Sequence, residues 1–305
     1  MKISNKMEDN NYEVIIIGGS YAGLSAGMTL GRSLRNVLII DSGKPCNRQT
    51  PHSHNFITQD GKTPKEISRL AKEQVEKYDT VKFYSGHAIK GMRNKSGYKV
   101  EVQSGESFNA KKLIFATGIK DIMPDIEGFS ECWGISVIHC PYCHGYEVKN
   151  EVTGILANGD AAMHYSYLVN NLTKRLSIFT NGPATFTDEQ MEVLKKRDIE
   201  IIELEIDRIE HKNGQITSLI FKNGSMIPLK AIYAKLPFIQ HSDIPENMGC
   251  ELTDQGFIRV NDLHHTNLTG VFACGDSSSL MRSVANAVST GSIVGAIVNK
   301  ELCEE

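Results

Sequence analysis

Several features that define large protein classes are missing from this 305-residue chain. Its longest apolar run, residues 14–17, is far too short to cross a bilayer, so we expect no membrane segment. Neither sign of charge dominates, because 33 Lys and Arg residues stand against 36 Asp and Glu residues. This balance argues against a protein that binds nucleic acids through a broad basic face. Residues 1–10 are polar and lack the apolar stretch of a secretory signal.

Cysteine is also sparse, since the seven cysteines are mostly scattered and a chain of this length needs no disulfide staples. The sequence therefore predicts a protein of the reducing cytoplasm. Cys140 and Cys143 are the exception, because their close spacing needs a chemical reason. At about 150 residues per domain, the length predicts two domains.

A strand–turn–helix–strand pattern follows the polar N-terminal residues. The β-branched residues 14–17 lead into a glycine-rich turn and then into a helical segment rich in small residues. A second apolar run, residues 37–40, ends in Asp41. This order is typical of the start of a doubly wound α/β domain.

The turn matches the pattern of a dinucleotide site with one change, because Gly18-x-Ser20-x-x-Gly23 has Ser20 at the position of the middle glycine. In such turns the glycines let the backbone approach a pyrophosphate, and the helix N-terminus supplies N–H groups and a positive dipole. Asp41 lies 23 residues after Gly18, where an acid can accept hydrogen bonds from an adenosine ribose. We therefore predict a bound dinucleotide. The alternative is that the glycines serve only helix–strand packing.

Further α/β elements follow along the chain. Strands are expected at residues 113–116, 154–157, 176–179 and 270–274, hairpins at the Asn-Gly pairs of residues 212–214 and 222–224, and a helix over about residues 281–302. The first of these strands ends at Thr117 and Gly118, and residues 123–128 form a connector. The pattern that begins at residue 154 repeats the first one in weaker form, which suggests duplication.

Four motifs stand in the order found in thioredoxin-reductase-like flavoproteins. They are the turn of residues 18–23, Ala-Thr-Gly at 116–118, Cys-Pro-Tyr-Cys at 140–143 and Ala-Cys-Gly-Asp at 273–276. The chain resembles this family over nearly its whole length. The resemblance implies an α/β fold of two Rossmann-like, three-layer ββα domains, and a homodimer. It assigns residues 1–118 and 245–305 to an FAD-binding domain, and residues 119–244 to an inserted pyridine-nucleotide-type domain that carries the cysteine pair.

The same resemblance implies cofactor-binding residues. Gly275 and Asp276 take the roles that place a carboxylate on the ribityl chain of the flavin. The N-terminus of the final helix, at Ser283 and Val284, points at the isoalloxazine ring, where its positive end stabilises the anionic reduced flavin. The full predicted FAD site comprises Gly18, Ser20, Gly23, Asp41, Arg48, Thr117, Gly118, Gly275, Asp276, Ser283 and Val284.

The cysteine pair itself admits three interpretations. A CxxC pair can close a small-ring disulfide and commonly lowers one thiolate pKa, so the pair can exchange two electrons with a flavin. A zinc site would recruit His139 and His144, but successive residues rarely point at one tetrahedral centre. The third interpretation is that both cysteines are buried packing residues. A predicted flavin in the same chain favours the redox interpretation.

By resemblance, Cys143 is the flavin-facing sulfur and Cys140 exchanges with the substrate. His144 stands where thioredoxin reductases carry an acid that moves the proton, and a histidine can accept a thiol proton near neutral pH. The alternative is an ordinary surface or capping histidine.

The second nucleotide unit lacks the residues that would bind a nicotinamide cofactor. Ala157 stands at the first glycine position, and residues 180–182 contain neither the arginines that bind a phosphorylated ribose nor an acid for an unphosphorylated one. We therefore expect a nicotinamide-type domain that keeps its fold without its ligand contacts.

Residues 46–54, 140–147 and 281–286 also resemble the FAD-dependent dithiol oxidases that close disulfides in natural products of the gliotoxin and holomycin type. That resemblance implies that a small dithiol reduces the Cys140–Cys143 disulfide, that FAD accepts the electrons, and that O2 reoxidises the flavin to give hydrogen peroxide. His52 and His54 either line the substrate pocket or are ordinary loop histidines. Two alternatives stay open: a reductase of thioredoxin-like proteins driven by NADPH or another redox partner, and a non-catalytic flavoprotein redox sensor.

Overall fold

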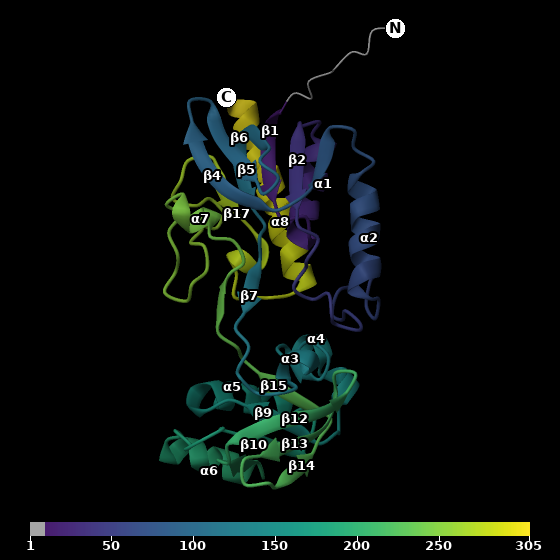
Figure 1. Ribbon diagram of the computed structural model, residues 1–305, viewed down its shortest axis with the longest axis vertical. Helices are drawn as coiled ribbons and strands as arrows, with labels where there is room; N and C mark the ends of the chain where they lie inside the picture. The colour runs from purple at the N-terminus through teal and green to yellow at the C-terminus, as the bar shows by residue number, and fades with distance from the viewer. Residues whose placement is uncertain (1–9) are drawn as a thin grey trace. The chain divides into compact units, whose positions relative to one another are not determined.

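The computed structural model describes residues 10–305, which form two compact units (Figure 1). Unit 1 consists of Met1–Cys46, Lys65–Lys120 and Phe238–Glu305, and unit 2 of Asn47–Pro64 and Asp121–Pro237. Strands β7 (Ile119–Asp121) and β16 (Phe238–Gln240), which pair with each other, lie where the chain passes between the units. The sequence analysis finds no secretory signal in residues 1–10, and of these only residue 10 lies in the described part.

Unit 1 is built on a seven-stranded sheet of order β3-β2-β1-β6-β5-β4, in which β17 also pairs with β6. The strands are β1 (Asn11–Ile17), β2 (Val37–Asp41), β3 (Val81–Ser85), β4 (Ala88–Asn94), β5 (Gly97–Val102), β6 (Ser107–Phe115) and β17 (Val271–Ala273). The first half of β6 pairs antiparallel with β5, and its second half pairs parallel with β17. β1 runs parallel to both β2 and β6. The parallel part of the sheet therefore continues into an antiparallel meander.

Both faces of the parallel strands are buried, which explains their continuous apolar sequences. Val14 and Ile16 of β1 lie in a core shared with α1 (Tyr21–Arg32), α2 (Pro64–Val75) and α8 (Val284–Glu304). Ile15 and Ile17 point the other way, into a core shared with the meander. Helices, parallel sheet and meander thus make the three layers that were predicted.

Helices α1 and α8 of unit 1 pack at unusually short range (Figure 1). A Cβ added at Gly291 would lie 2.1 Å from the carbonyl oxygen of Ala22, and one added at Gly295 would lie 2.7 Å from Thr29 Cβ. The hydroxyl of Ser25 donates to the carbonyl of Val288 at 2.7 Å. The small residues of both helices are therefore explained by this close contact.

Unit 2 repeats the three-layer plan around a parallel sheet of order β11-β10-β9-β15-β8. Its parallel strands are β8 (Val137–Ile138), β9 (Thr153–Leu156), β10 (Leu176–Phe179), β11 (Glu200–Ile202) and β15 (Ala231–Ala234). One face packs on α5 (Gly159–Val169) and α6 (Asp188–Lys196), and the other on the antiparallel strands β12 (Ile206–Lys212), β13 (Gln215–Phe221) and β14 (Met226–Pro228). Both Asn-Gly pairs lie in the turns of these hairpins, as predicted.

Short helices complete the two units. They are α3 (Phe129–Cys132), α4 (Pro141–His144) and η1 (Tyr146–Val148) in unit 2, and α7 (Ile244–Asn247) and η2 (Gly275–Ser277) in unit 1. Among the described residues, no helix combines the length and the apolar character that a bilayer-crossing segment requires.

Two predicted boundaries are wrong. The final helix begins at Val284 rather than at residue 281, because Ser283 is in an extended conformation and caps the helix by accepting the N–H of Asn286 at 3.1 Å. The strand expected at residues 113–116 starts at Ser107, since its first half is held by the meander strand β5. In both cases a specific hydrogen-bonding partner, rather than the apolar pattern, decides the end.

Candidate active site

Four turns of unit 1 meet at one edge of its sheet. Gly18, Thr117 and Gly275 directly follow or lie just after the adjacent strands β1, β6 and β17, and Asp41 ends β2. Because these strands are parallel, their carboxyl ends share an edge, where open α/β sheets bind ligands.

The glycine turn needs its glycines for close backbone approach. Gly18 has a φ of +107°, and a Cβ there would lie 2.2 Å from the carbonyl oxygen of Ala116. A Cβ at Gly23 would lie 1.8 Å from the carbonyl oxygen of Gly18. These contacts bring the start of α1 against the end of β1, so the glycines do serve helix–strand packing. It does not exclude a ligand, because the same turn also presents the N-terminus of α1.

The N-terminus of α1 is suited to an anion. Ser20 is the N-cap residue, yet its side chain makes no capping hydrogen bond, and the first turn of the helix contains no acidic residue. Asp41 receives the N–H of Gly19 on Oδ1 at 3.1 Å, which leaves Oδ2 for a ribose hydroxyl. Thr117 adds a buried hydroxyl that has no hydrogen-bond partner among the described residues. A dinucleotide at this edge would satisfy each of these groups.

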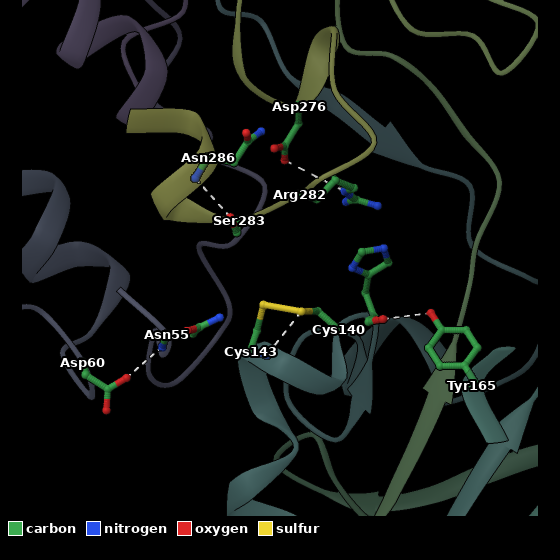
Figure 2. The surroundings of a disulfide bond; sticks show 10 residues. Asn55, Asp60, Cys140, Cys143, Tyr165, Asp276, Arg282, Ser283 and Asn286 are labelled. Atoms are coloured by element: carbon green, nitrogen blue, oxygen red, sulfur yellow. Dashed lines mark hydrogen bonds and ion pairs between the residues drawn. A yellow bond between two sulfur atoms is a disulfide. The ribbon is translucent and has the colours of Figure 1, made fainter. Parts of the chain in front are cut away.

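The late Gly-Asp motif lies beside the N-terminus of α8 (Figure 2). Gly275 has a φ of +73°, and its N–H donates to Thr290 Oγ1 of α8 at 3.0 Å. The carboxylate of Asp276 lies 3.9 Å from Arg282 Nε, in the segment that leads into the helix. Ser283 caps α8 and Val284 begins it, directly after the segment that contacts Asp276.

In unit 2, Cys140 and Cys143 form a disulfide across the short helix α4 (Figure 2). Cys140 is the N-cap residue of α4, and its sulfur accepts the N–H of Cys143 at 3.2 Å. Pro141 at the first helical position supplies the backbone angle that starts the turn. Both cysteines are half-buried, so the pair is neither a core packing contact nor fully exposed.

His144 follows the disulfide and is also half-buried. Burial lowers its pKa below the ordinary value, and the nearby His54 lowers it further, while Glu147 partly opposes both effects. The rings of His144 and His54 meet edge to face, with centroids 6.0 Å apart. His144 is therefore a base that stays neutral, and ready to accept a proton, over most of the neutral range.

The turn that would bind a second nucleotide is closed by the chain itself. Asn158 caps α5, and its Oδ1 accepts the N–H groups of Gly159 and Thr185, each at 2.9 Å, and the Thr185 hydroxyl at 3.0 Å. Asp160 lies in the first turn of α5 and accepts an N–H of Gln190 at 2.7 Å. A side-chain oxygen and a carboxylate thus stand at the helix end where a nucleotide phosphate would bind.

The predicted site residues divide between the two units. Unit 1 holds all the proposed cofactor residues except Arg48, and unit 2 holds Arg48, Cys140, Cys143 and His144. The prediction missed Asp60 and Glu147, whose carboxylates face His54. Acids in a loop and in a short 3-10 helix carry no periodic signal, so only their spatial neighbours reveal them.

Comparison with known proteins identifies the family. A family model described as pyridine nucleotide-disulphide oxidoreductase matches residues 12–291. The chain belongs to this family. Thioredoxin reductase tcpT of Claviceps purpurea is 28% identical, over 96% of this chain and 95% of that protein. Thioredoxin reductase sirT of Leptosphaeria maculans is also 28% identical, over 94% and 93%.

Solved structures agree with this assignment. An oxidoreductase from Agrobacterium tumefaciens has 34% identity and a TM-score of 0.90, covering 96% of this chain and 99% of that one. A putative thioredoxin reductase from Bacillus anthracis has 27% identity and a TM-score of 0.91, covering 96% and 99%. The predicted family and fold class are confirmed, and the protein is a thioredoxin-reductase-like disulfide oxidoreductase.

Proposed function

We propose that this oxidoreductase is an FAD-dependent dithiol oxidase. It converts a dithiol to a disulfide through Cys140 and Cys143, with O2 as the final electron acceptor. The substrate is a small dithiol or the dithiol of a thioredoxin-like protein. The cytoplasmic location and the homodimer stay predictions of the sequence.

The observation that carries this proposal is the closed turn at α5. In a nicotinamide-dependent reductase, the N-terminus of this helix must receive a cofactor phosphate. Here Asn158 already satisfies the first amide, and the negative charge of Asp160 repels an incoming phosphate. If NAD(P)H does not bind, the thiol substrate is an electron source that the cysteine pair can use directly, which makes oxidation the favoured direction.

FAD fits the sheet edge of unit 1. Gly18, Ser20 and Gly23 would hold the pyrophosphate at α1, Asp41 the adenosine ribose, and Asp276 the ribityl chain. The proposed site also includes Arg48, Thr117, Gly118, Gly275, Ser283 and Val284. The unpartnered Thr117 hydroxyl and the acid-free first turn of α1 support this fit. When bound, FAD supplies a two-electron acceptor for the reduced cysteine pair.

The chemistry of the protein residues is thiol–disulfide exchange. One substrate thiol loses its proton to His144, and the resulting thiolate attacks Cys140 Sγ and displaces Cys143 as a thiolate. After His144 has passed its proton to solvent, the second substrate thiol loses its own proton to His144, and the resulting thiolate attacks the substrate sulfur of this mixed disulfide and releases Cys140. The N–H of Cys143, which already contacts Cys140 Sγ, stabilises negative charge on that sulfur. The substrate leaves as a disulfide, and two electrons stay on the cysteine pair.

A thioredoxin reductase is the second candidate, because the relatives tcpT and sirT are named thioredoxin reductases. In that case electrons would flow from NADPH or another donor through the flavin to Cys140 and Cys143. The two candidates use the same cysteines and differ in what reduces the flavin.

The deciding experiment mixes the FAD-loaded protein anaerobically with dithiothreitol or with NADPH and follows the flavin absorbance. We expect dithiothreitol to bleach the flavin and micromolar NADPH to leave it oxidised. Cys143→Ser should abolish bleaching by dithiothreitol, whereas Cys303→Ser, at an exposed cysteine of α8, should not. Rapid bleaching by NADPH would overturn the proposal in favour of the reductase, and repeated turnover with dithiothreitol and oxygen would exclude a non-catalytic sensor.

A further inference from the structure

A short loop of unit 2 carries His54 to the redox helix. The loop is closed by hydrogen bonds from Ser53 N–H to the Lys62 carbonyl at 2.8 Å and from Gly61 N–H to the Ser53 carbonyl at 2.9 Å. Inside it, Asp60 Oδ1 accepts the N–H of Asn55 at 2.8 Å (Figure 2). These bonds fix the position of His54 although the loop contains no helix or long strand.

Both ring nitrogens of His54 face a carboxylate. Nδ1 lies 3.6 Å from Asp60 Oδ1, and Nε2 lies 3.5 Å from Glu147 Oε1, on the 3-10 helix that follows α4. The ring edge-to-face contact with His144 completes a set of four titratable groups. His52 is the next ring, with its centroid 6.3 Å from that of His54.

The two carboxylates are the most exposed members of this set. His144 is half-buried, the side chain of His54 is 20% exposed, and those of Glu147 and Asp60 are 41% and 67% exposed. The set therefore connects the residue beside the disulfide with two carboxylates in contact with water. Groups of this kind exchange protons readily near neutral pH.

His144 must pass on each proton that it accepts from the substrate. Each dithiol that is oxidised delivers two protons, and a single imidazole can hold only one of them at a time. The burial that keeps His144 neutral also limits its direct contact with water. Repeated turnover then depends on how fast the accepted proton leaves.

We propose that His54, between Glu147 and Asp60, relays the proton that His144 accepts, and that Asp60 passes it to water. This inference rests on the proposed dithiol oxidation. The proton of the attacking thiol moves to His144 and then to Glu147, which interacts electrostatically with His144 and faces Nε2 of His54. His54 accepts it at Nε2 and gives up the proton of Nδ1 to Asp60, which passes it to a water molecule or a buffer base. The electron pair of the S–H bond stays on sulfur and forms the new bond to Cys140, while Cys143 Sγ receives the pair of the broken disulfide. The buried Tyr233 hydroxyl, also near Glu147, keeps its proton because burial raises its pKa.

The test measures the rate at which dithiothreitol bleaches the flavin in His54→Ala and His54→Gln, with and without added imidazole. We expect both variants to be about tenfold slower, which is less than the roughly 10²- to 10⁴-fold contributed by a group in direct contact with the reacting proton. Imidazole should restore much of the rate in His54→Ala, because it replaces the missing proton carrier. Glu147→Gln, at an exposed position, should slow the same step, and His164→Ala, an exposed histidine of α5, serves as the unchanged control.

The outcomes separate the relay from the proposed function. If wild-type protein is bleached by dithiothreitol and His54→Gln reacts equally fast, the relay is wrong and the oxidase proposal stands. If His54→Ala is slow but does not respond to imidazole, His54 has a structural role and the relay is wrong. If dithiothreitol fails to bleach the wild-type flavin, both proposals fall.

Discussion

The environment of His144 converts an ordinary side chain into a base matched to thiol chemistry. Burial, followed by the neighbouring ring of His54, lowers its pKa, and the carboxylate of Glu147 opposes them. A lowered pKa means that the neutral, proton-accepting form persists to more acidic solution. In the proposed function, His144 would therefore begin each cycle in its proton-accepting form.

This environment predicts the pH dependence of dithiol oxidation. The rate should fall on the acid side only below pH 6.5, the ordinary histidine value, because protonation of His144 removes the base. Loss of His54 should move this acid limb to higher pH, since His54 lowers the pKa of His144. His144→Asn should reduce the rate by about 10²- to 10⁴-fold. Bleaching by dithiothreitol, measured from pH 5 to 9, checks these expectations; an acid limb that does not move in His54→Gln would contradict them.

Some of the residues at the site could be found from sequence, and others could not. The glycine turn, Asp41 and the cysteine pair are recognisable because each motif is local and has its own spacing. The contact of His54 with Glu147 joins segments far apart in the chain, so no local pattern contains it. Arg48 stays a predicted cofactor residue on the family resemblance, and its segment belongs to unit 2.

At the scale of elements, the contact of α1 with α8 fixes the shape of the proposed FAD site. α1 supplies its N-terminus to the glycine turn, and α8 begins beside Asp276. Gly291 lets the two helices meet at backbone distance, where even one methyl group would overlap the carbonyl of Ala22. The spacing of the two helix ends therefore depends on a residue far from any predicted ligand.

Gly291→Ala tests this dependence. We expect it to destabilise the protein by about 1–3 kcal/mol, because the added Cβ forces the helices apart. It should also weaken FAD retention, since both helix ends shift. Urea unfolding and the flavin-to-protein absorbance ratio are the measurements. Ser292→Ala, exposed on the same helix, should change stability by no more than about 0.5 kcal/mol, and equal behaviour of the two variants would contradict the packing argument.

The bounds of buried strands can be predicted from sequence, but the hydrogen bonds that close the turn before α5 cannot. Residues 176–179 are buried in the middle of a sheet, and their apolar run gives the bounds of β10. The missing glycine at Ala157 was visible in the sequence, and so was the weakness of the second nucleotide unit. That Asn158 and Thr185 would close the turn was not visible, because their hydrogen bonds join two loops that follow different strands.

At the scale of the whole molecule, the two three-layer units share a fold plan but differ in the functional groups that they carry. Unit 1 keeps an open helix N-terminus at its sheet edge, and unit 2 keeps the sheet but carries a disulfide and a closed turn. The assignment of an FAD domain to residues 1–118 and 245–305, and of a pyridine-nucleotide-type domain to residues 119–244, stays a prediction. The proposed division of labour joins one cofactor with one protein disulfide.

Oxygen uptake tests whether the electrons of the dithiol pass to O2. If O2 is the acceptor, each disulfide formed consumes one O2 and releases one hydrogen peroxide. Catalase returns half of that oxygen, so its addition should halve the net uptake in an oxygen electrode with dithiothreitol as substrate. Uptake that is insensitive to catalase, or absent while disulfide accumulates, would show that another acceptor takes the electrons.

The closed turn of α5 also bears on how this enzyme could be re-engineered. On the proposed function, a nicotinamide coenzyme would bind only after removal of the Asn158 side chain, neutralisation of Asp160 and addition of a ribose-binding residue after β10. If the proposed function holds, no single substitution restores pyridine-nucleotide use, and a catalyst built on this scaffold should oxidise thiols in a crude extract without NADPH competing as the electron donor to the flavin.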